Sequence, residues 1–239
     1  MKFFLAPMQG LTGYTVRNAF HHNFDYIDKY YTPFIPAAKR MNAKIKRDID
    51  PVNNDGITLI PQAMSIVADE VIDLHRQLVP YGYDEINVNL GCPSGTVVSK
   101  KRGSGILAYP DMLDSFLDEL YTKADFPVSI KTRVGFNDDE LWPKLIEIYS
   151  KYPISELTVH PRVQKDFYKN TPRMDDFALA MQKINPDKTT LCYNGDITDT
   201  NSFNALTDCF PDIDEIMIGR GLFANPALIA ELKGISMDK

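Results

Sequence analysis

Eight short runs rich in β-branched and aromatic residues alternate with segments of helical spacing along this 239-residue chain. The runs are Phe3–Ala6, Tyr26–Tyr30, Ile57–Pro61, Glu85–Asn89, Val128–Thr132, Glu156–His160, Thr190–Asn194 and Glu215–Ile218. Eight strand–helix units in a chain of about 250 residues predict a single-domain α/β fold, the (β/α)8 TIM barrel. Alternation alone does not show that the sheet closes, so an open doubly wound sheet is the alternative.

The helical segments repeat apolar residues every three or four positions, as amphipathic helices do. They include Val67–Leu78, Met112–Leu120, Leu141–Ile148 and Phe177–Ile184. Residues 31–56 are the least regular part of the chain because prolines and an Asn-Asn pair interrupt any long helix. There we predict one short helix near Ala37–Lys46, with loops around it.

Composition narrows the possible functions. Lys and Arg total 26 against 32 Asp and Glu, a net charge of −6, so bulk charge cannot hold this chain on nucleic acid. No stretch approaches the roughly 18 apolar residues of a membrane helix, and the apolar start breaks at Pro7. The three cysteines form no zinc-binding or Cys-x-x-Cys pattern, which predicts a reduced cytoplasmic location and no metal.

Polar and glycine-rich groups follow the predicted strands, at the end where TIM barrels place their chemistry. These groups are Pro7-Met8-Gln9-Gly10, Gln62, Asn89-x-Gly91-Cys92-Pro93, Lys131-x-Arg133, His160-x-Arg162, Asn194-Gly195-Asp196 and Gly219-Arg220-Gly221. The last two follow strands 7 and 8, where barrels bind phosphate through glycine backbones and a helix N-terminus, here expected near Phe223–Ala224. Together they predict an active site at one mouth of the barrel.

Lys131 and His160 each allow more than one reading. Lys131 could hold an anion or an electron-rich ring edge, or it could form a Schiff base as in an aldolase. His160 could donate to a ring carbonyl or a phosphate, act as an acid–base group, or be structural. His21, His22 and His75 fall on helices and are expected to be surface or packing residues.

Cys92 opens a Gly/Ser-rich loop that we expect to be exposed and mobile, and a thiol there can be a nucleophile or a proton donor. The basic cluster of that loop, Lys100-Lys101-Arg102, is either a solvated charge run or a contact for nucleic-acid phosphates. Cys192 lies within an apolar strand and Cys209 ends a helix, so both are expected to be packing residues.

These motifs resemble the tRNA-dihydrouridine synthases. The matching motifs are Ala6-Pro7-Met8-x-Gly10, Asn89-x-Gly91-Cys92-Pro93 with Gly103-x-Gly105, Lys131-x-Arg133-x-Gly135, Val159-His160-x-Arg162, Asn194-Gly195-Asp196 and Met217-Ile218-Gly219-Arg220-Gly221. They come in family order and cover nearly the whole chain. The resemblance implies an FMN-binding TIM barrel that reduces uridine in tRNA to 5,6-dihydrouridine, with NADPH as the reductant.

The resemblance also implies a role for each site residue. Reduced FMN would deliver a hydride to C6 of uracil, and Cys92 would supply the proton to C5. The residues implied to hold FMN are Pro7, Met8, Gln9, Gln62, Lys131, His160, Asn194, Gly195, Asp196, Gly219 and Arg220. Those implied or predicted to contact the substrate are Asn89, Lys100, Lys101, Arg102 and Arg162.

Two features depart from the family pattern. Gln164 stands where Arg is usual, and Asp166 where Gln is usual, which affects the RNA contacts expected of that loop. The chain also stops soon after Leu232, so the family's C-terminal helical RNA-binding domain is expected to be absent. That expectation keeps two alternatives open, namely a flavin enzyme acting on a free pyrimidine or another small conjugated substrate, and a truncated FMN-binding barrel without catalysis.

Overall fold

The computed structural model describes residues 1–24, 26–37 and 40–235, and its strands form one parallel sheet. The strands are β1 (Lys2–Leu5), β2 (Lys29–Tyr31), β3 (Ile35–Pro36), β4 (Leu59–Ile60), β5 (Gln62–Met64), β6 (Ile86–Leu90), β7 (Val128–Gly135), β8 (Glu156–Val163), β9 (Thr190–Tyr193) and β10 (Glu215–Ile218). Their order in the sheet is β3-β5-β6-β7-β8-β9-β10-β1-β2-β4.

The ten assigned strands occupy eight positions, because two of those positions are each divided in two. β2 and β3 are separated by three residues, and β4 and β5 by Pro61 alone. Since β2 pairs with β4 and β3 pairs with β5, the two ends of the sheet meet. The Thr32 amide donates to the Ile60 carbonyl between these pairs. The sheet therefore closes, which confirms the predicted TIM barrel over the open-sheet alternative.

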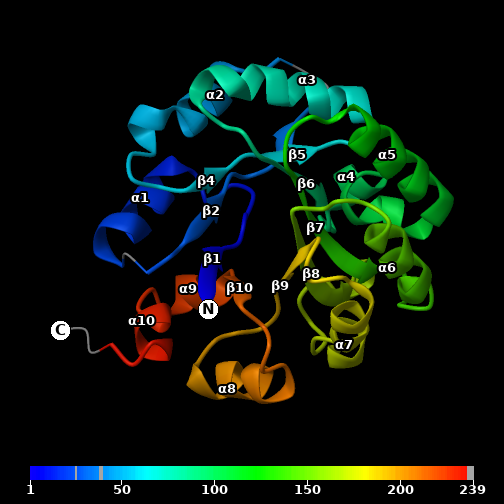
Figure 1. The fold of residues 1–239 in the computed structure, drawn as a ribbon. Helices are drawn as coiled ribbons and strands as arrows, with labels where there is room; N and C mark the ends of the chain where they lie inside the picture. The colour runs from blue at the N-terminus through cyan, green and yellow to red at the C-terminus, as the bar shows by residue number, and fades with distance from the viewer. Residues whose placement is uncertain (25, 38–39, 236–239) are drawn as a thin grey trace.

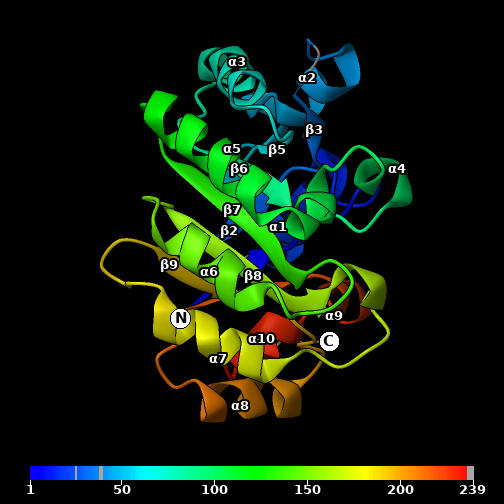
Figure 2. The same ribbon diagram turned by 90° about the vertical axis from the view of Figure 1, so that its right-hand side faces the viewer.

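Helices surround this sheet on its outer side (Figure 1). The helices are α1 (Tyr14–Asn23), α2 (Ala43–Ile49), α3 (Ala68–Leu78), α4 (Gly95–Val98), α5 (Pro110–Lys123), α6 (Trp142–Ser150), α7 (Met174–Lys183), α8 (Thr200–Cys209), α9 (Arg220–Ala224) and α10 (Leu228–Leu232), with short 3-10 turns that include η1 (Pro51–Asn53), η3 (Gly103–Ala108) and η4 (Gln164–Asp166). Figure 2 shows α5 and α6 beside β7. α3 buries Val71, Leu74 and Leu78 completely, as its apolar spacing predicts.

Inside the barrel, alternate strands contribute side chains in layers. The layer nearest the pocket comprises Ala6, Gln62, Lys131 and Asn194, the next Tyr31, Asn87, Thr158 and Met217, and the one below it Phe4, Ile60, Ser129 and Cys192. Lys29 and Glu156 close the opposite end. β2 and β8 lie on opposite sides of the ring, and the Lys29 Nζ reaches across to the Glu156 Oε2 at 2.7 Å. The barrel is thus filled below the pocket.

Several element boundaries differ from the predicted ones. The short helix expected near Ala37–Lys46 is α2, which begins at Ala43, and residues 38–39 of the expected range lie outside the described residues. β7 and β8 each run about three residues further than predicted, which carries Arg133 and Arg162 within the strands. Within the described ranges, no helix is both long and apolar enough to cross a lipid bilayer.

Candidate functional site

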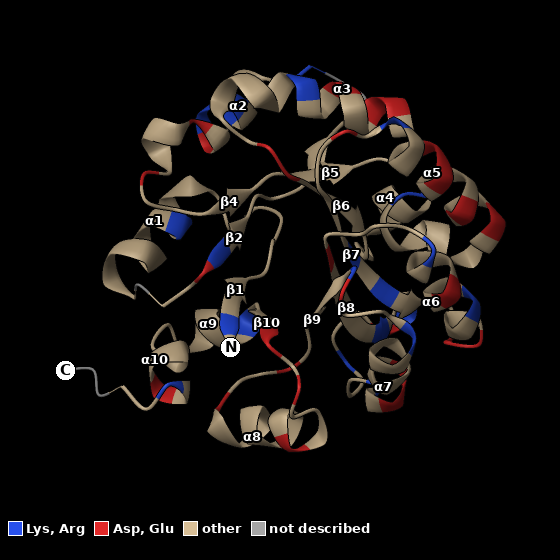
Figure 3. Ribbon diagram, viewed as in Figure 1, with Lys and Arg blue, Asp and Glu red and all other residues tan. Residues whose placement is uncertain are grey.

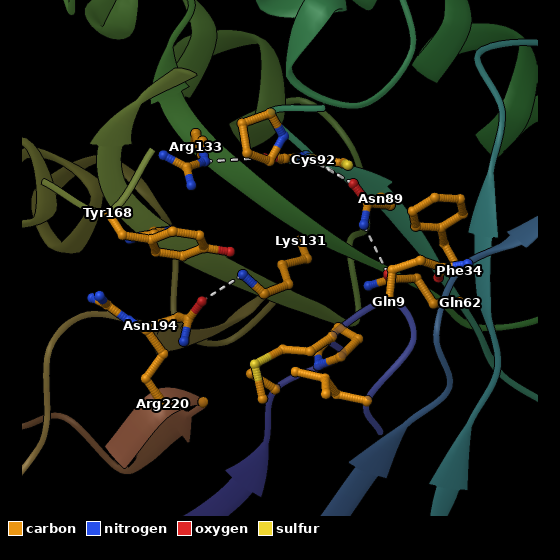
Figure 4. Close-up of a pocket in the computed structure, with 18 of the residues that line it drawn as sticks. Gln9, Phe34, Gln62, Asn89, Cys92, Lys131, Arg133, Tyr168, Asn194 and Arg220 are labelled. Carbon is orange, nitrogen blue, oxygen red and sulfur yellow. Dashed lines mark hydrogen bonds between the residues drawn. The ribbon is translucent and has the colours of Figure 1, made fainter. Parts of the chain in front are cut away.

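A cavity of about 450 Å³ opens at the carboxyl ends of the strands (Figure 4). That volume falls in the range of small-molecule and cofactor sites. Every residue predicted to hold FMN lines it, together with Asn89 and Cys92. The complete lining is Ala6, Pro7, Met8, Gln9, Leu11, Phe34, Gln62, Asn89, Gly91, Cys92, Pro93, Lys131, Arg133, His160, Tyr168, Asn194, Gly195, Asp196, Gly219 and Arg220.

Lys131 and His160 lie in the positively charged part of this cavity. Lys131 donates a hydrogen bond to the Asn194 Oδ1, and Asn194 in turn donates to the Met217 carbonyl at 2.7 Å. Burial, with the charge of Arg133 beside it, lowers the pKa of Lys131 to about 7. Burial also lowers the pKa of His160, helped by the neighbouring cations, so its imidazole is neutral at pH 7. The cations around these two side chains, which include Arg133 and Arg220, would favour an anionic ligand that offsets their charge.

A chain of buried amides positions the Cys92 backbone. The Asn89 Oδ1 accepts the N–H groups of Gly91 at 3.1 Å and Cys92 at 2.8 Å. The Asn89 Nδ2 donates to the Gln62 Oε1 at 2.8 Å, and the Gln62 Nε2 donates to the Asn87 Oδ1 at 2.8 Å. Asn89 was predicted to lie beside the substrate, and the structure places it in the cavity wall with its carbonyl oxygen committed to the cysteine loop (Figure 4).

The loop after Cys92 contains more helical structure and is more buried than we expected from its Gly/Ser content. Its first part forms α4, and its second part, η3, buries Gly103–Leu107. The Ser104 N–H and hydroxyl both donate to the Cys92 carbonyl, at 3.1 and 2.8 Å. A side chain at Gly103, where φ is +54°, would place its Cβ 2.7 Å from that same carbonyl. The prediction of an exposed segment is therefore wrong for residues 103–107, because tight backbone packing needs the glycines there.

Cys92 itself is half-buried in the cavity wall. Burial raises the pKa of its thiol, and the nearby positive charges of Arg133 and Lys131 offset that effect only partly. The sulfur is therefore a protonated thiol at neutral pH. A protonated thiol suits a proton donor better than a nucleophile.

Arg133 links the cysteine loop to the segment at the end of β8, a role that was not predicted. It is only 2 % exposed, and it donates to the carbonyls of Gly91, Val163 and Phe167 at 3.0, 2.9 and 2.9 Å. Its place in the Lys131-x-Arg133 motif was visible in the sequence, but its partners come from two distant loops. Gln164, on one of these loops, donates to the Pro93 carbonyl at 2.9 Å. The departure from the family pattern at Gln164 thus ties this loop to the cysteine loop.

The predicted phosphate end is an ion-pair network centred on Asp196. Its carboxylate accepts Arg162 on one side and the Arg220 Nη2 on the other, at 2.6 Å. Burial alone would raise the pKa of Asp196, but hydrogen bonds from Arg162 and the charge of Arg220 hold it below its usual value. A carboxylate cannot donate to a phosphate, so Asp196 can serve that site only through its backbone N–H and by orienting the arginines. The adjoining helix, α9, begins at Arg220, three residues before the expected position.

Four predicted substrate contacts lie outside the cavity lining. Arg162 is buried behind Asp196, with its Nη1 3.1 Å from the His160 Nε2. The Arg102 guanidinium pairs with Glu70 at 3.2 Å, and the Lys101 ammonium lies 4.3 Å from the centre of the Tyr109 ring. Lys100 is exposed. The structure therefore does not bring the basic cluster into the cavity, and its contact with RNA stays a prediction.

Two aromatic side chains of the cavity were missed. Phe34 lies between β2 and β3 and faces Asn89 and Gln62. Tyr168 lies on the opposite wall, between Arg133 and Arg220 (Figure 4). The Arg220 guanidinium carbon is 4.7 Å from the centre of the Tyr168 ring. Tyr168 belongs to the loop after β8, so its proximity to Arg220, the first residue of α9, could not be inferred from spacing.

Structural comparison independently supports the barrel. A variant of NCR from Zymomonas mobilis superimposes with a TM-score of 0.65 at 11 % identity, covering 100 % of this chain and 88 % of that one. Morphinone reductase superimposes with a TM-score of 0.64 at 10 % identity, covering 100 % and 87 %. At such low identity these similarities concern the fold alone.

Sequence comparison is more specific. The chain is 26 % identical to tRNA-dihydrouridine synthase B of Pasteurella multocida (strain Pm70), over 98 % of this chain and 69 % of that protein. It is 27 % identical to a probable tRNA-dihydrouridine synthase of Staphylococcus aureus (strain COL), over 94 % and 69 %. The family model "Dihydrouridine synthase (Dus)" matches residues 4–238. With its closed barrel and the cysteine-bearing mouth, this chain belongs to the dihydrouridine synthase family.

Proposed function

We propose that this chain reduces a uridine of tRNA to 5,6-dihydrouridine, using bound FMN, NADPH as the reductant and Cys92 as the proton donor. The observation that carries the proposal is that every residue predicted to hold FMN lines the same cavity as Asn89 and the protonated thiol of Cys92. Family membership supports the reaction class, since the relatives compared above are named tRNA-dihydrouridine synthases.

The residues present fit a flavin nucleotide. Gly219 has no side chain, so its backbone next to β1 is accessible to a ligand. An added Cβ would lie 3.3 Å from the Cβ of Ala6. Arg220 is half-exposed at this end and offers a charged donor to a phosphate. Lys131, Asn194 and Gln62 form the deep wall, where an ammonium and amides can bond to the polar edge of a ring. Bound and reduced, the flavin would supply the hydride that the reaction needs at C6 of uracil.

Side chains of this protein would donate the proton to C5 of uracil and replace it afterwards. The Cys92 S–H bond breaks as a C5–H bond forms, and the thiolate then regains a proton from solvent through the open mouth. Asn89 fixes the cysteine loop through two N–H groups, which keeps the sulfur in one position. The Arg133 and Lys131 charges would stabilise the thiolate left behind. The target base must leave its stack to reach this cavity.

One observation favours a second candidate, a Schiff-base enzyme acting through Lys131. A pKa of about 7 leaves much of that amine neutral and nucleophilic. Incubation with a small aldehyde and borohydride would leave a covalent mass increase on Lys131 if this candidate were correct. Membership of the dihydrouridine synthase family makes it the weaker candidate.

The proposal is tested by adding the purified protein, with FMN and NADPH, to an unmodified tRNA transcript and mapping dihydrouridine. We expect a yellow protein and conversion of specific uridines. A colourless protein that takes up no added FMN would contradict the cofactor assignment. A yellow protein that NADPH reduces but that leaves every uridine intact would contradict the substrate assignment and favour a small-molecule substrate.

A further inference from the structure

Phe167 is an exposed phenyl group on a strained backbone, and the next residue in the chain, Tyr168, belongs to the cavity wall. The φ of Phe167 is +52° and its ψ is −92°, a conformation that bulky side chains avoid, yet its side chain is 45 % exposed and so packs only partly against the protein. Glycine would adopt this backbone without strain. A Phe at this position therefore lowers the stability of the folded state relative to glycine, which points to a role in binding rather than in packing.

The surrounding residues hold Phe167 rigidly. Its carbonyl accepts the buried Arg133 guanidinium at 2.9 Å, and its N–H donates to the Gln164 carbonyl at 3.1 Å. The preceding Asp166 is buried and accepts from Arg173, from the Asn170 amide and from the Val163 N–H at 3.1 Å. The departure from the family pattern at Asp166 thus braces this loop. The phenyl group is presented on a fixed support rather than on a mobile segment.

The immediate surroundings match a nucleic acid. Tyr168, the next residue, lines the cavity, and its ring lies near the Arg133 and Arg220 guanidinium groups, at 5.7 and 4.7 Å. Two exposed lysines, Lys165 and Lys169, flank the pair in sequence. An exposed apolar side chain that is followed by a tyrosine in contact with arginines, and that has lysines nearby in sequence, is suited to a base and its phosphates, because bases stack on aromatic rings while cations contact the backbone.

We propose that Phe167 stacks against a tRNA base next to the one that enters the cavity. This inference rests on the proposed function. A base that leaves its stack exposes the face of its neighbour, and an apolar side chain that covers this face offsets the lost stacking. Phe167 would thereby bias binding toward RNA whose target base has already turned out.

The test compares Phe167→Gly with Phe167→Trp and with Val52→Ala, a control that trims an exposed apolar residue on η1. Binding of unmodified tRNA is measured by anisotropy with FMN present and NADPH omitted, so that chemistry does not contribute. We expect Phe167→Gly to weaken binding about 5- to 150-fold, the range for losing one stacked base. Phe167→Trp and Val52→Ala should bind as the wild type does.

Thermal unfolding separates a binding role from a packing role. Because glycine relieves the strained φ, Phe167→Gly should melt no lower than the wild type and should take up FMN normally. A clear fall in its Tm would mark Phe167 as a packing residue and overturn the inference. Unchanged tRNA binding by Phe167→Gly would also overturn it, as expected if the ring served a protein partner. Either result leaves the proposed function standing whenever the wild type still makes dihydrouridine.

Discussion

At the scale of single residues, the thiol of Cys92 carries the most specific claim. Cys92→Ala should keep FMN and its reduction by NADPH, because under the proposed function the sulfur serves proton transfer alone. Uridine reduction should fall about 10²- to 10⁴-fold, the usual contribution of a positioned acid. Single-turnover assays with pre-reduced protein and tRNA measure this step. Cys209→Ala is the control and should react at the wild-type rate. Cys209 lies exposed at the end of α8, so the expectation that it is a packing residue is wrong.

Arg220 carries a separate prediction about cofactor retention. Arg220→Ala should weaken FMN binding by about 1.5–3 kcal/mol, the worth of a charge-assisted hydrogen bond, reduced by competition from Asp196 for the same guanidinium. Fluorescence titration of the apoprotein with FMN measures the change. Arg76→Ala removes an exposed arginine from α3 and should leave the affinity as it was. Equal FMN affinity in Arg220→Ala and the wild type would refute a phosphate site at this end.

The sequence predicted well which residues line the cavity where strand ends decide their position. In a parallel barrel all carboxyl ends meet at one mouth, so the groups after seven of the eight predicted strands could be assembled without knowing any contact. The roles of Arg133 and Tyr168 in the cavity were not predicted, because their partners are far away in sequence. The burial of residues 103–107 was not predicted, because a glycine-rich composition is typical of exposed loops. Here the glycines instead permit close backbone packing beside Cys92.

At the scale of elements, α7 contains a carboxyl group that makes stability depend on pH. Burial, with Asp139 nearby, raises the pKa of Asp176 to about 7 from 3.8. The folded state therefore binds a proton that the unfolded state releases, and stability falls as pH rises from about 4 to about 7. Asp176→Asn should flatten this fall and raise the Tm at pH 8.

Melting curves at pH 5 and pH 8 check that prediction. Asp175→Asn is the matched control, since Asp175 is the exposed neighbour on the same helical turn. The difference in Tm between the two pH values should shrink for Asp176→Asn and stay as in the wild type for Asp175→Asn. The same dependence in all three proteins would show that Asp176 is not the group responsible.

For the whole molecule, the charge distribution limits how RNA can be held. Figure 3 shows acidic residues along α5. Of these, Asp111, Asp118 and Glu119 are exposed and Asp114 is half-buried. Near the mouth, the exposed lysines Lys100, Lys165 and Lys169 offer about three phosphate contacts. At about −0.7 to −0.9 per contact, the logarithm of the tRNA binding constant should fall with a slope of about −2 to −3 against the logarithm of salt concentration.

Anisotropy titrations from low to physiological salt measure this slope. A slope near −6 would mean that another part of this surface carries a basic RNA-binding region. Charge-reversal variants offer a control, because Lys100→Glu should make the slope shallower, whereas Lys188→Glu, on the turn after α7, should change it little.

The filled end of the barrel also constrains the order of events in turnover. The Lys29–Glu156 bridge and the buried layers above it leave the mouth as the way in and out of the cavity described here. Under the proposed function, the nicotinamide and the uracil must each reach the same flavin through that one opening. They therefore have to take turns, with the oxidised nucleotide leaving before the tRNA enters. Initial-rate plots at several fixed tRNA concentrations should accordingly give parallel double-reciprocal lines, and a large excess of either substrate should inhibit the other.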